Sequence, residues 1–193
     1  VKARITVAQE PAELVVPLTA LTGPQRRAEM FERIARPNPL GWTDQVAALS
    51  LARADLDTVS GEQRPAIVLL TDGKPEWNST PTREEQEAYL QKMQAGSRAL
   101  AEAGIPLFII LLANEATDAD PAITTIWQPQ WEAMSAATAP GRFYIAREAE
   151  DLPDIYHDIV VALTGNRTSG AVIQSEVGAG GIRRTVAVEA DSE

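Results

Sequence analysis

The sequence predicts an α/β domain with a doubly wound, mostly parallel open sheet, and three observations support this. The apolar runs at 66–71 and 105–112 fit strands that are covered on both faces, as in a parallel sheet. Apolar residues at helical spacing lie between them, and strands that alternate with helices are typical of doubly wound folds. The first run ends in Thr71-Asp72-Gly73, at the carboxyl end of a strand, where open α/β sheets place their ligands.

The residue pattern in the first half of the chain predicts a hairpin and two helices. Residues 3–8 and 13–18 have the pattern of paired strands that form an antiparallel edge of the sheet. Pro17 cannot donate to a ladder, which places the second of these strands outermost. Helical spacing follows at 24–36 and again at 44–59.

The second half continues the alternation. Thr82 and Glu85 have the spacing of a capping box and predict a helix that runs to about residue 103. The segment 121–137 is partly helical, with Trp127 and Trp131 on one face, where packing is the expected role. A short strand at 141–146 and an amphipathic helix at 152–163, stopped by Gly165, complete the pattern.

The tail has a different character. Residues 169–177 and 182–190 are rich in β-formers and flank a glycine-rich turn, so they predict a hairpin with no helix after it. We therefore expect one domain over 1–165 and, over 166–193, a linker and the start of a β-sandwich-like domain.

Composition excludes several classes of function. The chain of 193 residues has a net charge of −10, which disfavours nucleic acid and favours cations and basic surfaces. It has no cysteine, so disulfides and thiolate metal sites are impossible, and it has one histidine, His157, which we expect at the surface. No Gly-x-Ser-x-Gly elbow supports a hydrolase, and no apolar run approaches the ~20 residues of a membrane span.

Several segments together resemble the von Willebrand factor A (VWA) domain. The two most informative are Gly41-Trp42-Thr43-Asp44 before a helix and the apolar strand that ends in Thr71-Asp72-Gly73. The hairpin strand that ends at Leu18 and the segments 104–110 and 139–144 fit in the same order. The resemblance implies a site at the sheet edge that binds a metal ion and, through it, a partner protein.

In that family the metal-ion-dependent adhesion site takes ligands from three loops: an Asp-x-Ser-x-Ser motif, a Thr and an Asp. Thr43 matches the second and Asp72 the third, but no Asp-x-Ser-x-Ser occurs in this chain. The resemblance thus implies Mg²⁺ (or Ca²⁺ or Mn²⁺), bound weakly or not at all by this chain alone. Capping of the following helix by Thr43 or by Asp44 and a turn at Asp72 are the competing interpretations, and for Asp44 capping is the favoured one. The candidate partner-binding residues are Asp44, Gly73, Glu76 and Trp77.

The family's first, central strand is also absent from the sequence, and it would lie between residues 3–8 and 66–71. An open slot there would bury unpaired backbone groups, each costing roughly 1–3 kcal/mol, so we expect it to be occupied in a folded form. Three explanations stay open: further residues of a longer chain, a strand from a partner or from the C-terminal hairpin, or a diverged domain that has closed the slot.

The leading functional expectation is a non-enzymatic, adhesion-type protein-binding module. By the resemblance, an acidic side chain of the partner protein would complete the metal shell. The alternative is a metal-free structural or assembly domain of a larger multidomain protein. A hydrolase is a third hypothesis, for which no nucleophile and base can be assembled. The compartment is open between the extracellular or envelope side, which the resemblance favours, and the cytoplasm.

Overall fold

The computed structural model divides the chain into two compact units, Val1–Leu152 and Pro153–Glu193. The structure describes residues 2–7, 12–20, 23–35, 43–56, 65–77, 80–165, 173–178 and 181–186. The expected linker at 166–168 and the motif residues Gly41 and Trp42 lie outside these ranges.

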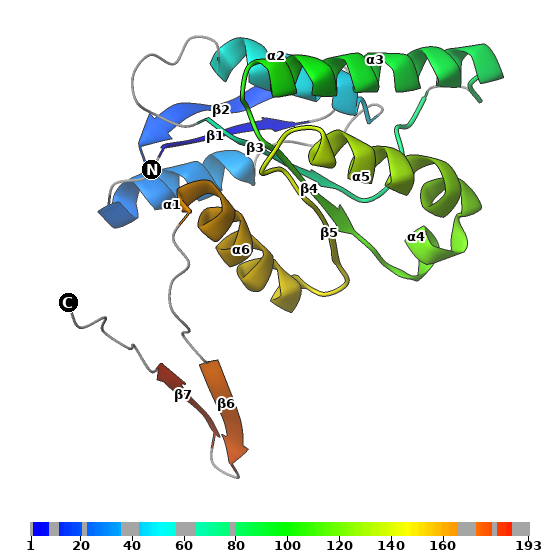
Figure 1. Cartoon of the computed structure of the whole chain (residues 1–193). Helices are drawn as coiled ribbons and strands as arrows, with labels where there is room; N and C mark the ends of the chain where they lie inside the picture. Colours follow the sequence, from blue (N-terminus) through cyan, green and yellow to red (C-terminus); the bar gives the residue numbers. More distant parts are fainter. Residues whose placement is uncertain are drawn as a thin grey trace. The chain divides into compact units, whose positions relative to one another are not determined.

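The centre of the first unit is a three-stranded parallel sheet in the order β3–β4–β5 (Figure 1). The strands are β3 (Ile67–Thr71), β4 (Leu107–Leu112) and β5 (Phe143–Ala146). In β4 every residue except Leu112 is buried, so both faces of this strand are covered. This confirms the α/β class that the unbroken apolar runs predict.

The N-terminal hairpin forms a separate sheet. Strands β1 (Lys2–Val7) and β2 (Glu13–Ala20) pair antiparallel with each other, from Lys2 opposite Ala20 to Val7 opposite Glu13. The hairpin was expected to be the antiparallel edge of the parallel sheet, and in this respect the structure differs. Joining the hairpin to the parallel sheet would require a strand that pairs with the outer edge of β3. Among the described residues there is no such strand, so the two sheets stay separate.

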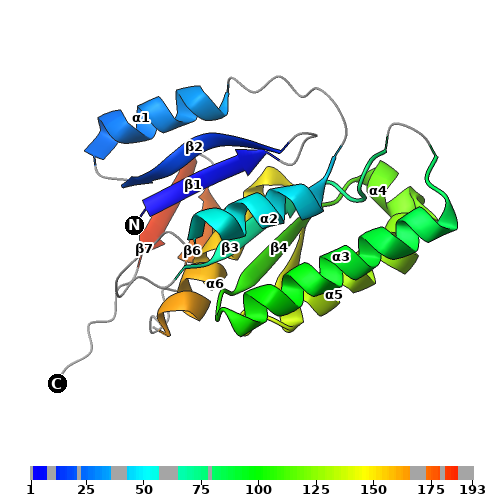
Figure 2. The same cartoon turned by 90° about the horizontal axis from the view of Figure 1, so that it is seen from above.

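Helices follow the expected pattern closely. The first two are α1 (Gly23–Ile34), which contacts β2, and α2 (Gln45–Leu56), which contacts β1 and α3. Helix α3 (Arg83–Glu102) begins with the predicted capping box: Thr82 accepts from the Glu85 N–H, and Glu85 accepts from the Thr82 N–H. It lies beside α5 (Gln128–Ala136), as Figure 2 shows.

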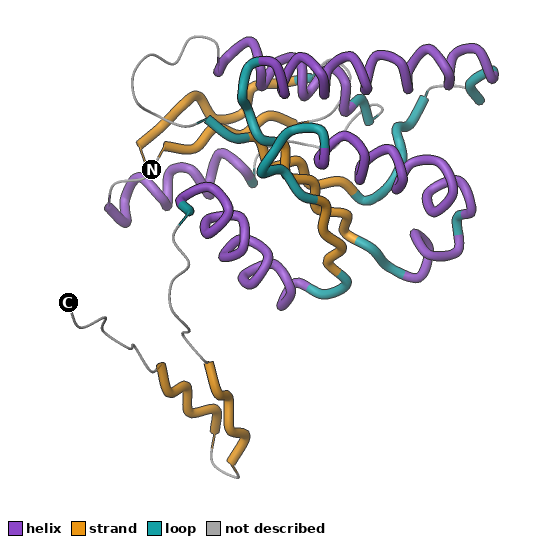
Figure 3. The backbone as a smooth tube through the Cα atoms, viewed as in Figure 1, coloured by secondary structure: helices purple, strands orange, loops and turns teal. Residues whose placement is uncertain are grey.

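Two short elements were not predicted, and a third has an unexpected form within the segment 121–137 that was predicted as partly helical. The first two are α4 (Glu115–Ala119) and the 3-10 turn Ala149–Asp151, and the third is the π-helical turn Ile123–Trp127 that leads into α5. Figure 3 shows the helical and loop segments that connect the strands to the longer helices.

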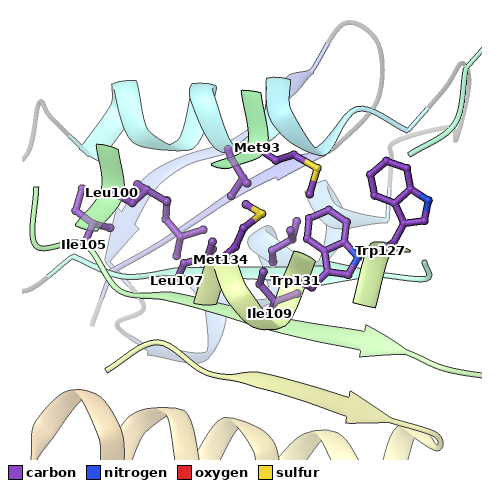
Figure 4. Packing of buried hydrophobic residues seen from close by; sticks show 11 residues of the cluster. Met93, Leu100, Ile105, Leu107, Ile109, Trp127, Trp131 and Met134 are labelled. Atoms are coloured by element: carbon purple, nitrogen blue, oxygen red, sulfur yellow. The ribbon is translucent and has the colours of Figure 1, made fainter. Parts of the chain in front are cut away.

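The main core of the first unit lies between the sheet and the helices α2, α3 and α5. Met93 and Leu100 of α3, Leu107 and Ile109 of β4, and Met134 of α5 belong to one packed hydrophobic cluster (Figure 4). Two tryptophans complete it: Trp127 is 3% exposed and Trp131 is fully buried. Their expected packing role is confirmed.

The second unit holds α6 (Leu152–Thr164) except its first residue, and the hairpin of β6 (Ile173–Gly178) and β7 (Gly181–Val186). Gly165 follows α6 with φ = +67°, a conformation that suits glycine and ends the helix as predicted. His157 is exposed, also as predicted. Within the described ranges, no helix is both long and apolar enough to cross a membrane.

Candidate binding edge at the carboxyl ends of the strands

Hydrogen bonds hold two of the predicted segments against each other where β3 ends. The Glu76 N–H donates to the Thr43 carbonyl at 3.1 Å. Two residues along, the Gln45 side-chain amide donates to the Thr71 hydroxyl at 3.3 Å, and Gln45 is fully buried. Thr43 and Asp72 therefore belong to adjacent loops at one edge of the sheet.

Asp44 caps helix α2. Its Oδ1 accepts from the Ala47 N–H at 3.0 Å, as the capping interpretation predicts. The Tyr89 hydroxyl of α3 lies 3.0 Å from the same oxygen and 3.2 Å from Gln45 Oε1, and it accepts from the Val46 N–H at 3.2 Å. Burial raises the pKa of Tyr89 well above its usual value, and the negative charge of Asp44 adds to this. Tyr89 thus holds the start of α2 in place from a different helix.

The backbone of Asp72 and Gly73 fixes the conformation of the loop after β3. Gly73 has φ = +152°, and a Cβ there would lie 2.6 Å from Ile123 Cδ1, so a side chain is excluded without rearrangement. Its carbonyl accepts from the Trp131 indole N–H at 3.1 Å. The Asp72 carbonyl accepts from the Thr117 hydroxyl at 3.4 Å, while the Asp72 side chain is exposed and bonds to no described residue. The backbone of Asp72 is therefore fixed at the edge, and its exposed carboxylate is accessible to a ligand.

A hollow of about 350 Å³ adjoins this loop, and the candidates Glu76 and Trp77 both line it. The Trp77 ring lies 5.5 Å from Tyr89 and 6.0 Å from Trp127 between centroids, which gives the hollow an aromatic wall. Its other lining residues are Lys74, Pro75, Thr80, Pro81, Gln86, Ala122 and Ile126.

The oxygen ligands at this edge are of the type that a hard cation prefers, but they are too few to fill its coordination shell. A threonine hydroxyl and a carboxylate are the oxygen ligands that Mg²⁺ and Ca²⁺ prefer. In the part of the chain that the structure describes, however, no three Asp, Glu, His or Cys side chains gather as a metal site. The nearby carboxylates are paired: Asp120 with Lys74, and Asp118 with Arg147 at 2.6 Å. These cations hold the pKa of both carboxyls below the usual range.

Sequence reasoning missed the residues that build this edge. Tyr89 and Gln45 act through contacts with residues far along the chain, for which no local pattern exists. Thr117 could have been found, since Asn114 accepts from its N–H at 3.0 Å as a cap three residues ahead of it. The Lys74–Asp120 pair had no signal in the sequence.

Comparisons with known proteins give little guidance. No family model and no curated protein matches the chain. Among solved structures, an uncharacterized membrane spanning protein from Vibrio fischeri is similar over 83% of this chain and 75% of its own, with 20% identity and a TM-score of 0.33.

Proposed function

We propose that this chain is a non-enzymatic protein-binding module of the VWA type, or derived from it, with its binding face at the carboxyl edge of the β3–β4–β5 sheet. The observation that carries the proposal is the pair of hydrogen bonds from Glu76 to Thr43 and from Gln45 to Thr71. These bonds join the two loops that bear the candidate ligands Thr43 and Asp72.

At this edge the Thr43 hydroxyl and the Asp72 carboxylate would bind Mg²⁺, or Ca²⁺ or Mn²⁺. Two protein groups with one formal charge leave most of a six-coordinate shell to water. The ion would therefore bind weakly to this chain alone and would accept a carboxylate from a partner protein. The metal would supply the electrophile, and the protein would position it.

The partner surface would extend from the metal edge into the aromatic hollow. Glu76 and Trp77 line that hollow and would touch the partner directly. Asp44 and Gly73 contribute by holding the loops, since one caps α2 and the other allows the turn after β3. A partner that offers an acidic side chain beside an apolar one fits this surface.

A metal-free structural or assembly domain is the second candidate, and one observation favours it. In the described ranges there is no acidic cluster of three, and Lys74 and Arg147 neutralise Asp120 and Asp118. In that case the hollow beside Trp77 would bind a partner without an ion.

The experiment is a titration with Mn²⁺ followed by paramagnetic broadening of the amide resonances, which detects weak sites. We expect broadening centred on Thr43, Asp72 and Gly73, and its loss in Asp72→Ala. Glu102→Ala is the matched control, because it removes an exposed carboxylate from the end of α3 without touching this edge.

Two results would decide against the metal site. One is broadening that Asp72→Ala leaves unchanged, and the other is no broadening near Thr43 at millimolar ion even when an Asp-x-Ser-x-Ser segment precedes Val1; either favours the metal-free candidate. Calorimetry is the complement: tight Mg²⁺ binding by residues 1–193 would contradict the expected weak affinity. Placing an Asp-x-Ser-x-Ser segment ahead of Val1 should strengthen binding, and Asp72→Ala should remove the gain.

A further inference from the structure

A second hollow lies between α2 and α3 and uses none of the residues of the metal edge. Its volume is about 280 Å³. Helix α2 contributes residues from Val46 to Ala54, and α3 contributes residues from Lys92 to Leu100. The floor is apolar, since Leu49, Met93 and Leu100 are buried core residues whose side chains reach the hollow. We call this site the α2–α3 groove.

Gly96 opens the groove. It lies in the interior of α3, where glycine costs roughly 0.5–1 kcal/mol relative to alanine. Apart from its chain neighbours and the backbone of its own helix, no atom lies within 4 Å of a Cβ built at this position, so packing does not require a glycine. The residue therefore weakens the helix and leaves space in the groove, a combination that suits a binding surface better than a structural one.

Two cations, Arg53 of α2 and Lys92 of α3, line the groove. Neither Arg53 of α2 nor Lys92 of α3 makes an ion pair or hydrogen bond with a described residue. The Arg53 Nε is shielded from solvent and has no acceptor, which is unfavourable for a charged donor. Two like charges lining one hollow also repel each other, and an anion between them would remove both penalties.

These charges stand out against the rest of the chain. The net charge is −10, so a groove lined by two cations differs in sign from the chain as a whole and would attract an acidic partner locally. The volume is below the roughly 300–1,000 Å³ of pockets that enclose small molecules, so the groove suits one or two side chains of a larger partner.

We propose that the α2–α3 groove binds an acidic amphipathic peptide segment of a partner protein. An apolar side chain of the segment enters the space above Gly96 and contacts Met93 and Leu100. A neighbouring Asp or Glu carboxylate accepts from the Arg53 guanidinium, including its Nε–H, and pairs with the Lys92 ammonium. Apolar burial supplies affinity, and the two cations set the orientation and reject basic segments.

The test uses a fluorescein-labelled synthetic amphipathic helix with leucine on one face and glutamate on the other, measured by fluorescence polarisation with the full chain. A second peptide with glutamine in place of glutamate is the charge control. We expect binding that weakens about tenfold in Arg53→Gln, as for loss of one charge-assisted hydrogen bond. Lys92→Gln should weaken it less, because Lys92 is exposed.

Gly96→Leu tests the groove without changing charge. It should abolish binding while the circular dichroism stays near wild type and the thermal midpoint does not fall, since a Cβ at this position meets no neighbouring element and leucine favours the helix. Arg98→Gln is the matched control, because it removes an exposed cation from the same helix outside the groove and should leave affinity unchanged.

Three results would overturn the proposal. The first is equal binding of the glutamine peptide, and the second is a loss in Arg98→Gln as large as in Arg53→Gln. The third is unchanged binding to a folded Gly96→Leu variant. If Arg53→Gln does not fold, Lys92→Gln and Gly96→Leu still decide the question.

Discussion

Replacing Tyr89 with phenylalanine tests how helix α3 holds the start of α2. The substitution removes one hydroxyl and keeps the ring, which packs edge-on against Trp77 and Trp127. What is lost is the acceptor for the Val46 N–H and a donor toward Asp44. The change therefore isolates the hydrogen bonds from the aromatic packing.

The expected cost is about 1–2 kcal/mol of unfolding free energy. The Val46 N–H lies in the first turn of α2, where a helix has no partner of its own for the amide. A partly buried donor left unsatisfied costs roughly 1–3 kcal/mol, and some access to water places the expectation in the lower part of this range. For a domain of about 150 residues this lowers the melting temperature by roughly 2–8 °C.

Urea unfolding followed by tryptophan fluorescence measures the free energy of unfolding of the first structural unit, to which Tyr89 belongs. All four tryptophans, at 42, 77, 127 and 131, precede Pro153, so the signal reports on the first unit alone. The urea dependence should keep its slope while the midpoint falls. Tyr156→Phe in α6 is the control and should leave the transition unchanged. A loss below about 0.5 kcal/mol in Tyr89→Phe would refute the reasoning, because that is the scatter of neutral substitutions.

The Tyr89→Phe substitution should also change how the free energy of unfolding depends on pH. Burial raises the pKa of Tyr89 in the folded state, so the folded protein disfavours the tyrosinate. The stability that this represents is fully present below the unfolded-state pKa of about 10 and is lost as the pH rises above it. Wild type should therefore lose stability more steeply than Tyr89→Phe above about pH 10. Equal alkaline slopes would show that the hydroxyl is not buried as described.

Two further substitutions use the same assay. Gly141→Ala should cost at least about 2 kcal/mol, because its Cβ would lie 2.5 Å from the Leu107 carbonyl and 2.5 Å from the Thr138 hydroxyl. A cost below about 1 kcal/mol would mean that the backbone around Gly141 can shift away from these atoms with little loss of stability. Gly96→Ala should raise stability by about 0.5–1 kcal/mol, since a methyl group there meets nothing and favours the helix; a decrease would contradict the open groove.

Elements with a local signal were predicted well. The unbroken apolar run at 105–112 became β4, and the Thr82–Glu85 spacing became the capping box of α3. Both depend on residues within a few positions of each other, so the sequence alone contains the information. Residues Ile123–Trp127 lie in a segment predicted as partly helical, but their π-helical form was not predicted because i→i+5 bonds have no comparable residue signature.

Contacts between distant residues were beyond sequence reasoning. The Thr138 hydroxyl accepts from the Leu107 N–H at 2.8 Å across 31 residues, and nothing near either residue indicates the other. At the candidate edge, strand-end placement identified Asp72, but Tyr89, which supports the facing loop, lies 45 residues after Asp44. The candidate residues of this edge were thus identified from the sequence, whereas the contacts that position their loops were not.

The outer edge of β3 provides the last prediction. The Ile67 N–H donates to the Pro106 carbonyl, so the amides of Leu69 and Thr71 face β4, and those of Val68 and Leu70 point the other way. No strand pairs with that side in the described ranges, and β1 does not fill the place. In a monomeric sample we expect Val68 and Leu70 to exchange their amide hydrogens at least about tenfold faster than Leu69 and Thr71. An extended apolar segment that pairs with this edge should slow the two exposed amides selectively. Equal protection of all four amides in the chain alone would show that the edge is already occupied, by the C-terminal hairpin or by a second copy.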